Sequence, residues 1–177
     1  MTEENPSRME ELQQKENENG WYNLNFGTAY LSKGTRHNLI SALTASKRGI
    51  GTHIAIDGED SYMFDAYGRK YPMRVVDKQL RLDARLYSAN GEYREITLIH
   101  DSGAASSVLR AEECDLWGDP GDKVVTMGGY TGEREQLTGG NDLCLMIRAN
   151  EDYQWTNHVE FAKQEHLDKG ILLAEIL

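Results

Sequence analysis

Two segments of alternating apolar and polar residues, joined by Asn90-Gly91, constrain the fold of this 177-residue chain more than any other feature. The first segment places three apolar side chains on one face of a strand, at Leu82, Ala84 and Leu86. Asn-Gly is a strong hairpin signal, because both central residues of a type I′ turn need a positive φ. The second segment, residues 92–100, alternates as well and leads directly into Asp101-Ser102-Gly103. The sequence therefore predicts a β-hairpin that ends in an acidic turn.

The residues after this turn indicate further β-structure. Residues 108–122 are typical of a connector with a short helical or looped piece and a Pro-Gly turn. Residues 124–135 predict a hairpin with a glycine-rich tip, and residues 142–149 alternate as a strand does. An apolar run closes the chain at residues 170–177.

The first eighty residues carry weaker signals. Residues 1–20 are almost wholly polar and cannot bury enough apolar area to offset the entropy of ordering, so a disordered or loosely helical tail is expected. Residues 38–46 predict a helix with an apolar face and Gly49 as its stop; the face contains Leu39, Ile40 and Leu43. Short strands are expected within residues 52–56, 61–67 and 70–76. We therefore expect a small α+β accessory region, residues 21–80, before a β domain at residues 81–177.

Composition and charge exclude several classes of protein. Hydrophobic residues make up 39% of the chain, and no stretch approaches the roughly 18 apolar residues that a membrane-spanning helix needs. The net charge of -10 repels phosphate backbones, so no nucleic-acid partner is expected. The polar first twenty residues are not a secretory signal. Cys114 and Cys144 make no disulfide framework, which favours a reducing, cytoplasmic location.

Motifs for metal, phosphate and serine chemistry are missing from the sequence. The five histidines form no H-E-x-x-H pattern, and the two cysteines form no C-x-x-C pair. No Gly-Lys-Ser/Thr follows the glycine-rich segment, and Ser106 and Ser107 lack a G-x-S-x-G context. No metal and no cofactor are therefore expected.

The acidic turn has the residue types that acid proteolysis needs. Two carboxylates about 3 Å apart cannot both ionise, so they share one proton and can act together as general acid and general base. An aspartate at the end of a buried strand, such as Asp101, can be held against a second one. The Ser102 hydroxyl can support the paired loops, and Gly103 permits a sharp turn and a close approach of two backbones. A mobile glycine-rich tip at residues 128–132 can close over an extended peptide and exclude water.

The order of these segments resembles that of the retropepsins, the aspartic proteases of retroviruses and LTR retrotransposons. The shared order is a hairpin, Asp101-Ser102-Gly103-Ala104, a hairpin with paired glycines, a long strand, and two aliphatic residues before a small one. The resemblance covers about 95 residues, from about residue 81 to the end. His100 stands where the family usually has an aliphatic residue, and strand alternation directs it away from the Asp101 face.

The resemblance implies a role for each matching residue. Asp101 would be the catalytic carboxylate, supported by the active-site loop residues Ser102, Gly103 and Ala104. The flap that covers the substrate would comprise Met127, Gly128, Gly129, Tyr130, Thr131 and Gly132. The hydrophobic motif beneath the active-site loop would be Leu172, Leu173 and Ala174. Because such a chain supplies one aspartate, activity would require a homodimer.

These observations predict a mainly β chain with a retropepsin-like acid-protease barrel, as a single lobe that pairs in a homodimer. The expected function is that of an aspartic endopeptidase that cleaves a retroviral or retrotransposon polyprotein through an aspartate-activated water. One alternative is a non-catalytic retropepsin-like module that dimerises or binds extended peptides. Another is an unrelated β domain, in which Asp101-Ser102-Gly103 is an ordinary turn after a strand.

Overall fold

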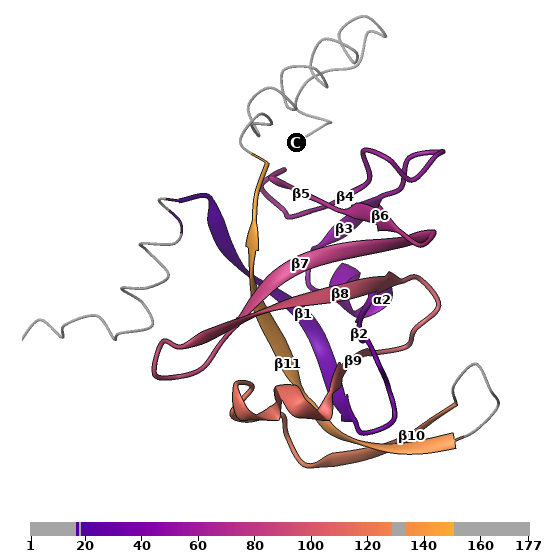
Figure 1. The fold of residues 1–177 in the computed structure, drawn as a ribbon, viewed down its shortest axis with the longest axis vertical. Helices are drawn as coiled ribbons and strands as arrows, with labels where there is room; N and C mark the ends of the chain where they lie inside the picture. Colours follow the sequence, from indigo (N-terminus) through magenta and orange to yellow (C-terminus); the bar gives the residue numbers. More distant parts are fainter. Residues whose placement is uncertain (1–16, 18, 129–133, 151–177) are drawn as a thin grey trace, which may run out of the picture.

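The computed structural model describes residues 17, 19–128 and 134–150, and these residues are mainly β (Figure 1). The large sheet contains β1 (Trp21–Ser32), β2 (Asn38–Ser41), β6 (Arg74–Val76), β7 (Gln79–Tyr87), β8 (Tyr93–Asp101), β9 (Ser107–Arg110), β10 (Lys123–Gly128) and β11 (Arg134–Arg148). The small sheet contains β3 (Gly51–His53), β4 (Tyr62–Phe64) and β5 (Lys70–Pro72). Helical turns form α2 (Ala42–Lys47) and the 3-10 helix η1 (Ala111–Asp115).

The large sheet closes on itself as a barrel. Its strands lie in the order β10-β11-β1-β9-β2-β8-β7-β6, and β11 also pairs with β7 through Met146 and Arg85. This additional pairing joins six strands, β11-β1-β9-β2-β8-β7, into a ring. Closure leaves the strands of the ring with neighbours on both sides, which removes exposed sheet edges. The mainly β class expected from the sequence is confirmed.

One apolar core holds the ring and the small sheet together. Large side chains of the ring strands are fully or almost fully buried in it: Phe26, Leu82, Leu86, Leu98, Leu143, Leu145 and Ile147. The small sheet adds Met63 and Tyr71, which are fully buried in the same cluster. At roughly 25 cal/mol per Å² of apolar area, this shared burial is the main force that fixes the small sheet against the barrel.

The predicted hairpin is present as β7 and β8, which pair in an antiparallel register. Its inward residues are buried as expected: Leu82, Ala84 and Leu86. The turn differs from the expected two-residue type, because Gly91 has a φ of +89° but Asn90 has no positive φ, and the Ser88 amide donates to the Glu92 carbonyl at 2.8 Å. A two-residue turn with both φ values positive occurs instead at Asp77-Lys78, between β6 and β7.

Residues 38–46 are not one helix, contrary to the sequence-based expectation. Residues 38–41 form the strand β2, and the helix α2 begins only at Ala42, where Ser41 is its N-cap. The predicted stop at Gly49 is correct, since its amide donates to the Ser46 carbonyl and its φ is +83°. The spacing of Leu39, Ile40 and Leu43 fits a helix, but long-range pairing of β2 with β8 and β9 decides the local structure.

The expected boundary at residue 80 does not divide the large sheet. From the predicted accessory region, β1 pairs with β9 and β11, β2 pairs with β8 and β9, and β6 pairs with β7. Strands on both sides of the boundary therefore build one barrel.

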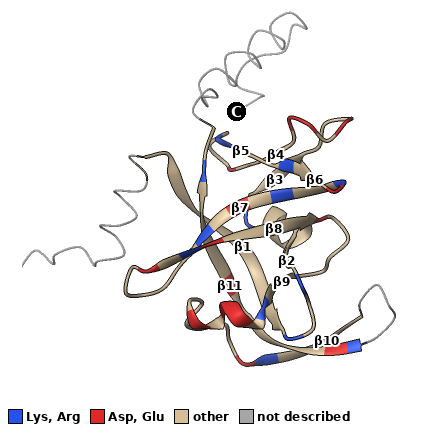
Figure 2. Ribbon diagram, viewed as in Figure 1, with Lys and Arg blue, Asp and Glu red and all other residues tan. Residues whose placement is uncertain are grey.

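Figure 2 shows acidic residues gathered on η1 and charges of both signs along β7. Among the residues that the structure describes, no helix is long and apolar enough to cross a membrane.

Candidate functional site

Asp101 ends β8 and begins the turn to β9. Its carboxylate is half-buried, and its Oδ1 accepts a hydrogen bond from the Gly103 amide at 2.9 Å. This short contact fixes the direction of the carboxylate relative to the turn. Alternation places Thr97 and Ile99 on the Asp101 face of β8, whereas Leu98 faces the core and is fully buried.

Two serine hydroxyls outside Asp101-Ser102-Gly103 hold the turn in place. Ser41 of β2 is the register partner of Asp101, is fully buried, and donates from its Oγ to the Ala104 carbonyl at 2.7 Å. The Ser107 Oγ accepts from the Ser41 amide at 2.9 Å. The Ser41 Oγ also accepts from the Thr44 amide at 3.1 Å and so caps α2. The turn, β2 and α2 are therefore joined through one side chain.

Ser102 lies differently from these two serines. Its side chain is exposed, and none of the described residues forms a hydrogen bond with its hydroxyl. Gly103 is exposed as well, and a Cβ at this position would lie 3.5 Å from Asp101 Oδ1, an ordinary contact distance. Within one chain, the turn is therefore supported mostly by Ser41 and Ser107, and less by the expected loop residues Ser102 and Gly103.

A pair of aliphatic residues followed by a small one lies directly beside the Asp101 turn. Leu39 and Ile40 precede Ser41 on β2, and Ile40 is fully buried opposite His100 in the register of the two strands. Sequence reasoning placed such a motif at Leu172, Leu173 and Ala174, which lie outside the described residues. The same pattern at residues 39–41 could have been found in the sequence, but it precedes the hairpin instead of following it.

A second apolar cluster packs the β10–β11 hairpin against β1, β2 and β9. Its buried members are Tyr30, Val108 and Leu137, and Leu39, Val125 and Met127 pack against them. Of the expected flap residues, Met127 and Gly128 therefore form the end of β10, paired with Glu135 and Arg134. The others, Gly129, Tyr130, Thr131 and Gly132, lie outside the described residues.

The end of this hairpin nearest its tip is bound to the last residue of β1 and to the loop between β1 and β2. Both carboxylate oxygens of Glu135 accept from the Ser32 Oγ, at 3.0 and 2.9 Å. Its Oε1 also accepts from the Lys33 and Gly34 amides at 3.1 and 3.0 Å. Several hydrogen bonds to one ionised group give this contact more strength than a neutral pair would have. The hairpin therefore has a fixed position relative to β2 and its serine.

His100 lies on the opposite face of β8 from Asp101, as alternation predicts. Its ring is half-buried, and its Nε2 lies 3.0 Å from the Thr52 Oγ1. Burial lowers the pKa of His100 below its ordinary value, and the neighbouring Asp101 carboxylate opposes this shift. The imidazole is therefore favoured in its neutral form, in contact with the small sheet.

The chemistry available at this site is that of one oriented carboxylate. The Asp101 carboxylate accepts from the Gly103 amide, and Ser41 holds the same turn through the Ala104 carbonyl. A proton-sharing pair of the kind used in acid proteolysis needs a second carboxylate beside it. No protein-family model, curated protein or solved structure matches the chain.

Proposed function

We propose that this protein is an aspartic endopeptidase of the retropepsin type that works as a homodimer. The observation that carries the proposal is the position of Asp101, at the end of a buried barrel strand in a turn held by Gly103, Ser41 and Ser107. A catalytic group needs such support, because misplacement by about 1 Å costs much of the rate. The resemblance of the Asp101-Ser102-Gly103-Ala104 segment to retropepsins suggests a polyprotein as the substrate.

The proposed reaction uses one Asp101 from each protomer. The two carboxylates share a single proton, so the ionised one takes a proton from water while the other donates its proton to the carbonyl oxygen of the peptide. The water oxygen bonds to the carbonyl carbon to give a tetrahedral diol. The carboxyl group that took the proton from water then passes it to the leaving nitrogen as the carbon–nitrogen bond breaks, and the other carboxylate takes a proton back from a diol hydroxyl, which leaves a carboxylic acid and an amine. The peptide would lie between the turn and the β10–β11 hairpin, beside the packed cluster that includes Leu39, Val108 and Met127.

Replacement of Asp101 by Asn tests this proposal. Wild type, Asp101→Asn and Asp122→Asn are incubated with an unfolded protein substrate between about pH 4 and pH 7, with and without pepstatin, and new peptides are measured by mass spectrometry. Asp122 is an exposed aspartate before β10, so its variant keeps the turn intact. We expect cleavage by wild type and Asp122→Asn, inhibition by pepstatin, and no cleavage by Asp101→Asn.

The same experiment separates the enzyme from the non-catalytic alternative. Equal cleavage by wild type and Asp101→Asn would contradict the catalytic role of Asp101. Absence of cleavage in all three proteins, together with equal binding of an extended peptide, would favour a dimerisation or peptide-binding module.

A further inference from the structure

A groove of about 680 Å³ lies beside the proposed catalytic turn. Its floor includes Thr97 and Ile99, which share one face of β8 with Asp101. Ile99 is two residues from Asp101, which corresponds to about 7 Å along a strand. An extended peptide bound at Asp101 would therefore place a side chain close to this groove.

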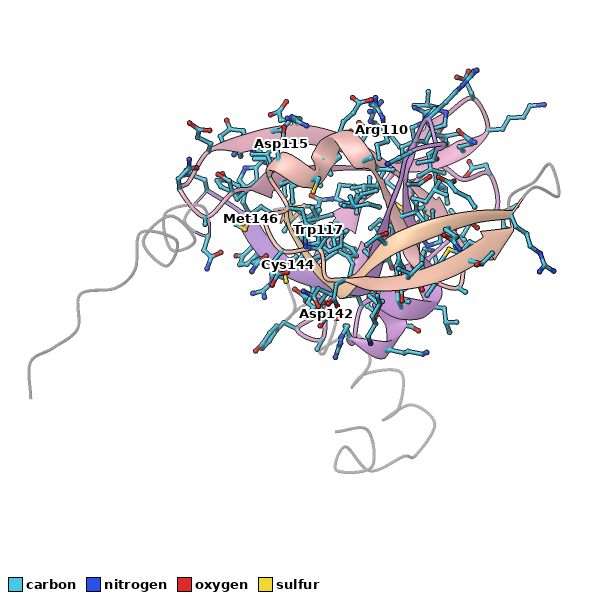
Figure 3. All side chains as sticks on the ribbon, turned by 90° about the horizontal axis from the view of Figure 1, so that it is seen from below. Arg110, Asp115, Trp117, Asp142, Cys144 and Met146 are labelled. Carbon is cyan, nitrogen blue, oxygen red and sulfur yellow. The ribbon has the colours of Figure 1, made fainter. Side chains whose placement is uncertain are left out.

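Four arginines line this groove in a chain whose net charge is -10; they are Arg36, Arg81, Arg94 and Arg110. Two of them are already paired with the acidic residues of η1, since Arg94 contacts Glu113 at 2.8 Å and Arg110 contacts Glu112 at 2.5 Å. In Figure 3, Arg110 and Asp115 lie near the upper side of the molecule, and Asp142 lies towards the lower side.

The other two arginines have no carboxylate partner among the described residues. Arg81 is the register partner of Ile99; its Nη2 donates to the Gln79 Oε1 at 3.2 Å, and its Nε is buried without an acceptor. Arg36 is exposed before β2. Two further acidic residues line the groove: Glu95 lies 3.8 Å from Arg85, and Asp115 follows Glu112 and Glu113 on η1. The unpaired positive charge is therefore on the side formed by β7 and the residues before β2.

We propose that this groove receives an acidic side chain of the extended peptide, within about three residues of the cleaved bond. This inference rests on the proposed protease function and specifies its substrate class. Neither Arg81 nor Arg36 has a carboxylate partner among the described residues, and a peptide carboxylate in the groove supplies an acceptor that matches the planar geometry of a guanidinium. A glutamine or asparagine at the same position lacks the charge and accepts fewer hydrogen bonds, so it binds more weakly.

A binding measurement tests the groove without requiring cleavage. The full-length Asp101→Asn protein is titrated with two fluorescein-labelled octapeptide pools, which are identical except for Glu or Gln at one position, and anisotropy gives the affinity. The Glu/Gln position is moved along the octapeptide from one pair of pools to the next. At one of these positions we expect the Glu pool to bind at least ten times more tightly than the Gln pool. Arg81→Gln and Arg36→Gln are each expected to reduce this ratio severalfold. Arg48→Gln is the control, because Arg48 pairs with Asp142 on the other side of the molecule.

The outcomes separate this inference from the proposed function. Equal affinity for the two pools, or a preference that survives in both Arg81→Gln and Arg36→Gln, overturns the acidic-side-chain site even if the wild type cleaves peptides. A preference for Glu that is lost in these variants supports the site even if the wild type does not cleave. Because Arg36 is exposed, Arg36→Gln keeps the test valid if Arg81→Gln does not fold.

Discussion

The Ser41 hydroxyl connects three parts of the site: it donates to the turn after Asp101 and accepts from the first turn of α2. Ser41→Ala leaves the Ala104 carbonyl without its donor and α2 without its cap, which together are expected to lower the free energy of unfolding by about 1–3 kcal/mol. Because the turn positions Asp101, we also expect a lower kcat with a nearly unchanged KM. Ser46→Ala is the control, since Ser46 bonds only within α2. Equal kcat in the two variants would contradict the positioning role of Ser41.

His100 makes the stability of the barrel depend on pH, and this dependence can be measured without an activity assay. Its lowered pKa means that the folded protein favours the neutral imidazole, so the unfolded chain binds more protons as the pH falls below about 6.5. The stabilising contribution of the neutral ring is present above that pH and is lost as the pH falls towards the folded pKa.

His100→Leu removes this titration at the cost of the contact with Thr52. We expect the melting temperature of His100→Leu, relative to wild type, to rise steadily from about pH 7.5 to about pH 5. If the melting temperatures of the two proteins differ by the same amount at every pH in this range, the ring is not held neutral.

Among the elements, β2 bears most directly on the site, because it pairs with β8 up to Asp101 and carries Ile40 and Ser41 beside the turn. Ile40 is fully buried, so Ile40→Ala is expected to lower the free energy of unfolding by about 2–5 kcal/mol. Leu173→Ala makes the same kind of change in the motif that the sequence first suggested. Urea unfolding and cleavage rates of both variants show which motif supports the turn. If only Leu173→Ala loses activity, residues 172–174 support the Asp101 turn and residues 39–41 do not.

Local patterns predicted some elements and missed others for physical reasons. Alternation found β7 and β8, because one face of each strand is buried against a core. The strand β2 was mistaken for helix, since two adjacent aliphatic residues in a four-residue strand have no distinct period. Its partners β8 and β9 are about 60 residues away, so only tertiary pairing reveals it.

In the candidate site, too, some residues could be predicted from local sequence and others depend on long-range pairing. Asp101, Gly103 and Ala104 could be named from a short motif, because the turn that they form is local. Ser41 contacts Ala104, which is 63 positions later in the sequence, and Glu135 contacts Ser32, which is 103 positions earlier. These contacts follow from the pairing of β2 with β8 and of β1 with β11. No local pattern connects these residues.

At the scale of the whole molecule, the proposed chemistry requires two copies of the chain, because each copy supplies one Asp101. Activity per milligram is therefore expected to fall as wild-type protein is diluted below the dissociation constant of the dimer. Sedimentation at the same concentrations measures how much dimer remains. A constant specific activity in samples that sediment as monomers would rule out the shared site.

Mixed dimers give a sharper version of this measurement. Wild type and Asp101→Asn are mixed in varying proportion at constant total concentration, with time for the subunits to exchange. If each site needs both carboxylates and the chains pair at random, an equal mixture retains about a quarter of the wild-type activity, because only that fraction of pairs has two aspartates. If each chain works alone, the same mixture retains about half. Asp122→Asn replaces Asp101→Asn in the control mixture and is expected to leave the activity unchanged, since it keeps its own Asp101. A linear dependence on the wild-type fraction would therefore exclude a catalytic pair shared between two protomers.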